Sequence, residues 1–248
     1  MKSKIHDTSF SELAKQYKKN KIERISKKIL FITFIMISQM NFGQITKTLG
    51  DFNKVTSFDQ IEVLLIRGQE NKIILNGNGA EEVELINKNG ELKIRMPLTK
   101  LLSGENVSVT LYFKNIDAIE ANEGSRISSQ ETFKEIAFEV IAKEGSQIKI
   151  NLDVDKVSVR SSNGSNVNLE GKAKNQDAIT NSGGELDAEN LITAQTTITA
   201  NAGGEANIFA TDFVDAKTRA GGNITIFGKP KQINKKTVLG GIIKESNQ

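Results

Sequence analysis

The stretch from residue 159 to residue 208 repeats one pattern three times: VRSSNGSNVNL (159–169), AITNSGGELDA (178–188) and ITANAGGEANI (198–208). Three further copies flank it: IEANEGSRISS (119–129), VIAKEGSQIKI (140–150) and AKTRAGGNITI (216–226). The glycine at the centre of each copy recurs after 21, 19, 19, 20 and 18 residues. A near-constant period in this range is typical of a solenoid. The six anchor glycines are Gly124, Gly145, Gly164, Gly183, Gly203 and Gly221.

Apolar and polar residues alternate after every anchor glycine. Positions three and five after it are mostly apolar, and positions two and four after it are mostly polar, which predicts a half-buried strand. Positions three and five before it carry small or apolar residues, which predicts a narrow inner corner. Glycine suits the corner because it adopts positive φ without a Cβ penalty. The outward residues two positions after the glycine form a candidate ligand face: Arg126, Gln147, Asn166, Glu185, Glu205 and Asn223.

The rest of the exported part also reads as strands and turns. Residues 45–57 are expected to be a linker or a first strand, and FDQIEVLLIRGQENKIIL (58–75) predicts a strand pair around a turn at Gly68 and Asn71. Asn89-Gly90 predicts a two-residue hairpin. We expect 58–115 to form leading strands and hairpins, 116–228 the coils, and 229–245 a C-terminal cap.

Two further groups of residues complete the predicted coil. Phe133, Ile136 and Phe138 are expected to supply another buried face of the coil. In the cap, Pro230 and the lysines around it are typical of residues that protect open strand edges. These lysines are Lys229, Lys231, Lys235 and Lys236.

The N-terminal 44 residues have the layout of a signal peptide. A basic segment precedes the apolar run ILFITFIMI (29–37), and the sequence SQMNFGQ follows. We expect cleavage near Gly43 or Gln44. The alternative is an uncleaved membrane anchor over residues 29–42, but a membrane span needs about 20 apolar residues.

Composition excludes several functions. Residues 45–248 hold 24 basic and 27 acidic residues, so they lack the dense basic surface that a nucleic-acid partner requires. The chain has no cysteine, which excludes disulfides, thiolate metal sites and a lipid anchor on cysteine. Its only histidine, His6, lies in the leader, so the exported part has no histidine base or metal ligand. We expect no cofactor and no metal site.

The order of these motifs resembles the auto-transporter adhesin head domain, also called the GIN domain, of Bacteroidetes-type bacteria. The resemblance covers residues 50–245 and is carried by FDQIEVLLIRGQENKIIL, GELKIRM, NSGGELDAENL, RAGGNITIFGKPKQI and KTVLGGIIK. It implies an all-β fold, a single-stranded right-handed parallel β-helix with less regular N-terminal strands as its cap. It implies no catalytic residues.

We therefore expect an exported, non-enzymatic envelope or cell-surface protein that acts in adhesion or as a structural module. Its location would be the periplasm, the outer cell surface or the medium, and its partner a protein, a glycan or a second copy of itself. A membrane is a partner only if residues 29–42 stay attached. The alternative is a β-helix that binds or cleaves carbohydrate, for which the candidate residues are Asp153, Asp155, Lys156 and Arg160.

Overall fold

The computed structural model describes residues 15–19 and 44–246. Residues 15–19 are helical and belong to one compact unit, Met1–Gly43, while Gln44–Gln248 form a second unit. The predicted apolar run of the signal peptide, 29–37, lies outside the described residues. Within the described part of the chain, no helix is long and apolar enough to cross a membrane.

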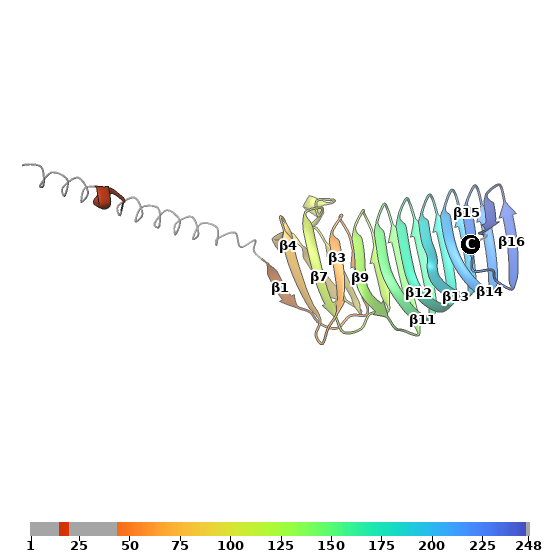
Figure 1. Ribbon diagram of the computed structural model, residues 1–248, viewed down its shortest axis with the longest axis horizontal. Helices are drawn as coiled ribbons and strands as arrows, with labels where there is room; N and C mark the ends of the chain where they lie inside the picture. The colour runs from red at the N-terminus through yellow and green to blue at the C-terminus, as the bar shows by residue number, and fades with distance from the viewer. Residues whose placement is uncertain (1–14, 20–43, 247–248) are drawn as a thin grey trace, which may run out of the picture. The chain divides into compact units, whose positions relative to one another are not determined.

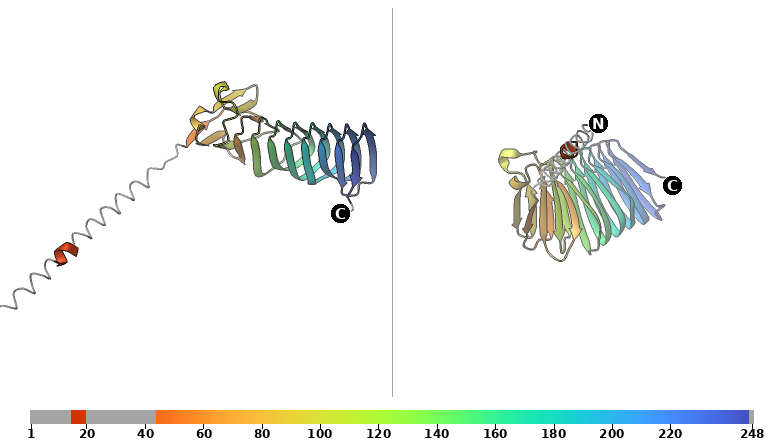
Figure 2. Two further views of the ribbon diagram at one scale, coloured as in Figure 1. Left: turned by 90° about the horizontal axis from the view of Figure 1, so that it is seen from above. Right: turned by 60° about the vertical axis from the view of Figure 1, so that its left-hand side comes forward.

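The second unit is a parallel β-solenoid, as predicted, and its coils stack side by side along one axis (Figures 1 and 2). Each regular coil contributes one strand to each of two faces. The first half of β11, for example, pairs with β9 and its second half pairs with β10. We call the face that follows each anchor glycine face A and the face that precedes it face B.

Face A contains seven strands and the first halves of four long ones. In spatial order these are β1 (Ile45–Thr48), β4 (Lys72–Gly77), β7 (Val107–Phe113), β3 (Glu62–Arg67), β9 (Arg126–Phe133), β11 (Gln147–Ser162), β12 (Asn166–Asn181), β13 (Glu185–Asn201), β14 (Glu205–Arg219), β15 (Asn223–Phe227) and β17 (Ile242–Glu245).

Face B contains the second halves of β11 to β14 and six further strands. In spatial order these six are β5 (Glu84–Lys88), β6 (Glu91–Arg95), β2 (Lys54–Ser57), β8 (Ala118–Ala121), β10 (Ala137–Lys143) and, after β14, β16 (Gln232–Val238). Two short 3-10 helices, η1 (Ala80–Glu82) and η2 (Leu98–Lys100), lie in the connections.

The core lies between the two faces and follows the columns read from the sequence. Every residue three or five positions before or after an anchor glycine is buried. These residues come from successive coils in register, for example Val159 beside Ala178 and Ile148 beside Val167. Each coil therefore buries its apolar side chains only against its neighbours, which is how a solenoid builds a continuous core.

Each corner is a tight turn with two consecutive residues in the left-handed region. Asn163 has a φ of 56° and Gly164 a φ of 71°, and the Ser165 N–H donates to the Ser162 carbonyl at 3.3 Å. All six anchor glycines have φ between 70° and 83°. Two positive φ values define a type I′ turn, which explains why glycine takes the second position of every corner.

The N-terminal coils do not stack in the order of the sequence. The coil made of β2 and β3 is the first in the chain, but it lies between the β6–β7 coil and the β8–β9 coil. The predicted pairing within 58–75 is therefore wrong, because β7 lies between β3 and β4 and pairs with both. The predicted hairpin at Asn89-Gly90 is confirmed, since it joins the antiparallel strands β5 and β6.

The C-terminal coil replaces core residues with charge. Lys235 on β16 stands in register with the buried Ala216, and Glu245 on β17 stands in register with the buried Ile226. Their side chains form an ion pair at 2.6 Å. Inward-pointing charges are one way in which natural sheets prevent further strands from adding to an open end.

One predicted core residue is exposed. Phe133 and Phe138 are buried and pack with Phe113, with ring centroids 5.6 Å and 4.9 Å apart along the row. Ile136 lies in the connection between β9 and β10 and is 82% exposed. The prediction that it joins the buried face is wrong because the chain turns there and points its side chain to solvent.

Candidate interaction surfaces

The six residues of the candidate ligand face lie in register on the outer surface of face A. Gln147 is aligned with Arg126 and with Asn166, and the alignment continues through Glu185 to the last coils. None of these six side chains lies in the core. We call this row the polar ladder; its members are Arg126, Gln147, Asn166, Glu185, Glu205 and Asn223.

Neighbouring side chains of the polar ladder form hydrogen bonds with one another. The Asn166 side-chain amide donates to Glu185 at 2.9 Å, and the Asn223 amide donates to Glu205 at 3.3 Å. In the next outward column, Asn168 donates to Asp187 at 3.1 Å. Cross-strand pairs of this kind fix the side chains in one arrangement. The outer surface of face A is therefore a row of ordered polar groups.

Two of the depressions on the outer surfaces involve residues singled out in the sequence. One, of about 310 Å³, is at the C-terminal end of face A, between the outward residues of β14, β15 and β17, among them Glu205, Asn223 and Lys244. The other, of about 230 Å³, is on face B, beside Arg160 and the neighbouring outward column that carries Glu139, Ser158 and Asp177. Both are lined by outward side chains of successive rungs.

The residues considered for carbohydrate cleavage do not converge. Asp153 lies on face A with Lys172 at 3.5 Å, and Asp155, at the turn onto face B, pairs with Lys174 at 2.7 Å. Arg160 lies on the outer side of face B. Asp153 and Arg160 thus face solvent from opposite sides of the coil. Among the residues that the structure describes, no group of three or more acidic or histidine side chains is arranged to hold a metal ion.

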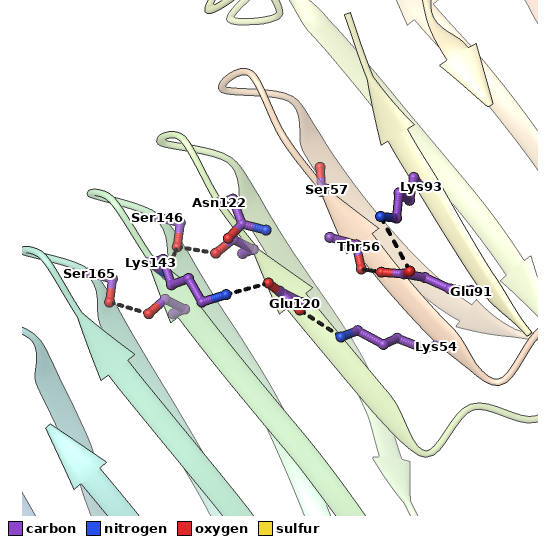
Figure 3. A network of polar contacts seen from close by, with 12 residues as sticks. Lys54, Thr56, Ser57, Glu91, Lys93, Glu120, Asn122, Lys143, Ser146 and Ser165 are labelled. Atoms are coloured by element: carbon purple, nitrogen blue, oxygen red, sulfur yellow. Dashed lines mark hydrogen bonds and ion pairs between the residues drawn. The ribbon is translucent and has the colours of Figure 1, made fainter. Parts of the chain in front are cut away.

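The most buried cluster of ion pairs is on face B, centred on Glu120 (Figure 3). Its carboxylate accepts hydrogen bonds from Lys54 at 2.6 Å and from Lys143 at 2.7 Å, and its side chain is 13% exposed. Burial raises the pKa of Glu120, but the hydrogen bonds from the two lysines outweigh burial and hold it below its usual value. Burial likewise lowers the pKa of Lys54, but the hydrogen bond to Glu120 and the negative charges of Glu120, Glu91 and Glu139 together raise it above its usual value. This cluster ties β2 to the coils that follow it.

Comparison with known proteins agrees with this architecture. A family model described as "Putative auto-transporter adhesin, head GIN domain" matches residues 51–230. The chain belongs to this family. No match was found among curated proteins.

Solved structures resemble this GIN domain in fold. A putative adhesin from Bacteroides fragilis NCTC 9343 superposes with a TM-score of 0.76 at 18% identity, covering 82% of this chain and 96% of that one. A putative adhesin from Parabacteroides distasonis ATCC 8503 gives a TM-score of 0.67 at 17% identity, with the same coverage. A putative lipid binding protein from the same organism gives 0.57 at 14% identity, covering 84% and 98%.

The GIN domain also contains a buried serine row directly after the anchor glycines, whose hydrogen bonds were not predicted above. Ser125, Ser146 and Ser165 each follow an anchor glycine and are buried. Their hydroxyls donate to carbonyls of the preceding coil at 3.0, 2.7 and 2.8 Å. Figure 3 shows the bonds of Ser146 and Ser165. In later coils glycine replaces serine, and a Cβ at Gly184 would lie 2.5 Å from the Ser161 carbonyl carbon. The sequence does contain a signal for this row, because only serine or glycine occurs in the position after each anchor glycine.

Proposed function

We propose that this protein is an exported, non-enzymatic module of the cell envelope that binds a protein or glycan through face A. The observation that carries the proposal is the polar ladder, in which polar side chains repeat in register from β9 to β15. Adjacent rungs of a sheet are about 4.8 Å apart. A ligand with its own repeat meets a polar side chain at every rung.

The internal hydrogen bonds of the ladder favour binding. Asn166, Glu185, Glu205 and Asn223 are already held by their neighbours, so a ligand orders few additional side chains. Binding costs less when the side chains at the interface are fixed beforehand. Each contact is weak at an exposed position, and we expect affinity to come from several rungs acting together.

Export is supported by the leader. The basic segment and the apolar run at 29–37 fit a signal peptide, and the absence of cysteine from the chain leaves no site for a lipid anchor on cysteine. The family name and the adhesin names of the similar structures agree with a surface or periplasmic role.

The test is binding by the fragment 44–248 to glycan arrays and to surface proteins of the cell envelope. Substitution of Glu185 and Glu205 by lysine is expected to abolish binding of any ligand found. The matched control is the double variant Asp177→Lys with Asp215→Lys, which makes the same charge change on face B. Equal binding by the two variants would reject face A as the ligand surface.

The runner-up function is carbohydrate binding or cleavage on face B. It is favoured by the depression beside Arg160, whose neighbouring outward column carries Glu139 and Asp177, since charged planar groups make strong hydrogen bonds to polar ligands. Release of shortened product from a bound polysaccharide, lost in Arg160→Gln, would favour this function over the first.

A further inference from the structure

One loop at the N-terminal end of the solenoid exposes three leucines. It joins β6 to β7 over 96–106 and contains η2, and it projects beyond the strand ends in Figures 1 and 2. Leu98, Leu101 and Leu102 are 71%, 55% and 53% exposed. Exposed apolar residues are ordinary when they occur singly, but a cluster of them marks a contact surface. We call residues 98–102 the leucine loop.

Hydrogen bonds to the buried Asp59 fix the backbone of the leucine loop. Asp59 is buried, and its two carboxylate oxygens accept hydrogen bonds from the Met96 N–H at 2.9 Å and the Leu102 N–H at 2.8 Å. The Gly104 N–H donates to the Asp59 carbonyl at 2.9 Å, and Lys100 pairs with Glu82 at 2.7 Å. A buried carboxylate is tolerated only when it is hydrogen-bonded in this way. These contacts fix the loop in a conformation that exposes the three leucine side chains.

The loop lies at the end where the chain joins the fold. Ile45 is in register with Leu75, which is in register with Val109. Ile45 is thus two strand spacings, about 10 Å, from Val109. Val109 lies only five positions after Gly104, near the end of the loop. The apolar run of the leader, 29–37, ends eight residues before Ile45. The leucine loop and the connection to the leader therefore share one corner of the solenoid.

We propose that the leucine loop contacts a lipid bilayer and rests the N-terminal end of the solenoid on a membrane. A convex apolar tip inserts between lipid headgroups without a shaped pocket, and such insertion is driven by the apolar area buried. Charge contributes little, because the cations next to the loop are already paired: Arg95 with Glu84 at 2.8 Å and Lys93 with Glu91 at 3.4 Å. This role goes beyond the proposed function of face A and does not depend on it.

The first experiment is vesicle flotation of the fragment 44–248, whose buried core lies wholly within it. Vesicles of phosphatidylcholine alone and with phosphatidylglycerol are used. We expect the fragment to float with both, and the triple variant Leu98→Ser, Leu101→Ser, Leu102→Ser to partition at least about tenfold less, since it loses the apolar area of three leucine side chains. The matched control is Ile136→Ser with Leu239→Ser, which removes apolar side chains 82% and 86% exposed elsewhere on the surface and keeps wild-type binding.

A second experiment does not depend on the triple variant. The chain has no tryptophan, so Leu98→Trp introduces a single reporter, whose emission is expected to shift to the blue on addition of either vesicle. Ile136→Trp is the control and shows no shift. The proposal is overturned by failure of the wild-type fragment to float, by equal flotation of the triple variant, or by binding that needs phosphatidylglycerol and vanishes in salt. A dimer that dissociates on leucine substitution would instead assign the loop to a second copy.

Discussion

Two adjacent glycines in one corner should fail for different reasons when each is replaced by alanine. Gly183 has a φ of 70° and open space where its Cβ would stand, whereas Gly184 has no such φ but faces the preceding coil. At Gly184 a Cβ would lie 2.5 Å from the Ser161 carbonyl carbon and 2.7 Å from the Ser162 nitrogen. Both neighbours are backbone atoms of a hydrogen-bonded ladder and do not rotate away.

The two costs differ in size. Alanine in the left-handed region costs about 1 kcal/mol, and the corners already tolerate Ala202 and Ala220 at φ of 46° and 49°. Relief of the Gly184 contact needs the coils to separate by about 1 Å, and overpacking of this kind costs about 3 kcal/mol. For a fold of this size 1 kcal/mol lowers Tm by about 2–4 °C. Gly183→Ala should therefore lower Tm by about 2–4 °C and Gly184→Ala by about 6–12 °C.

Thermal unfolding of the fragment 44–248, followed by circular dichroism, measures both variants. They alter adjacent residues of the same coil, so each serves as the positional control for the other. If Gly183→Ala lowers Tm as much as Gly184→Ala does, the backbone conformation and not the coil spacing decides the choice of glycine, and the reasoning fails.

Three further predictions concern the ion pair at the end, the Glu120 cluster and the corner. Replacing Lys235 by isoleucine and Glu245 by leucine should make the fragment associate as its concentration rises, and a monomer at every concentration in sedimentation would contradict this. The lowered folded-state pKa of Glu120 means that its ionised form stabilises the fold above its unfolded pKa, about 4.3, and that this stabilisation is lost as pH falls through the folded pKa. Glu120→Gln should therefore reduce the free energy of unfolding by about 1 kcal/mol at pH 7 and leave it unchanged at pH 2, as measured by urea unfolding; an equal loss at both pH values would refute it. Gly164→Val should lower Tm more than Asn168→Val, because only the first puts a β-branched side chain at positive φ; equal melting temperatures would count against the register.

The sequence predicted the regular coils in detail because their pattern is local. Each anchor glycine fixed the corner, and alternation around it assigned residues such as Ile148 and Lys149 to the inside and outside. The same alternation placed the polar ladder on the outer surface. These assignments need only the period of a strand and the preference of glycine for positive φ.

The order of the strands in the N-terminal coils could not be predicted in this way. Local alternation shows that β3 and β4 are strands, but it contains no information about which strand lies beside them. The neighbour of both is β7, whose Leu111 aligns with Leu65 and with Ile73. An apolar column accepts any strand with the same alternation, so the order of strands depends on long-range packing. The inward position of Lys235, in contrast, was open to the same reasoning as the regular coils, since Gly240 follows Gly221 after 19 residues and Lys235 lies five positions before it.

The position of the β2–β3 coil between two later coils has a consequence for how the chain acquires its structure. Lys54 pairs with residues 37 and 64 positions further along, whereas regular coils pair with segments about 19 residues away. Closing the longer loops costs more entropy before any contact rewards it. Folding should therefore begin with a slow step that brings the first 70 or so residues of the solenoid together, and later coils should then add rapidly, one on the next. During synthesis from the N-terminus, β2 and β3 would therefore stay unpaired until β6 to β9 have been made.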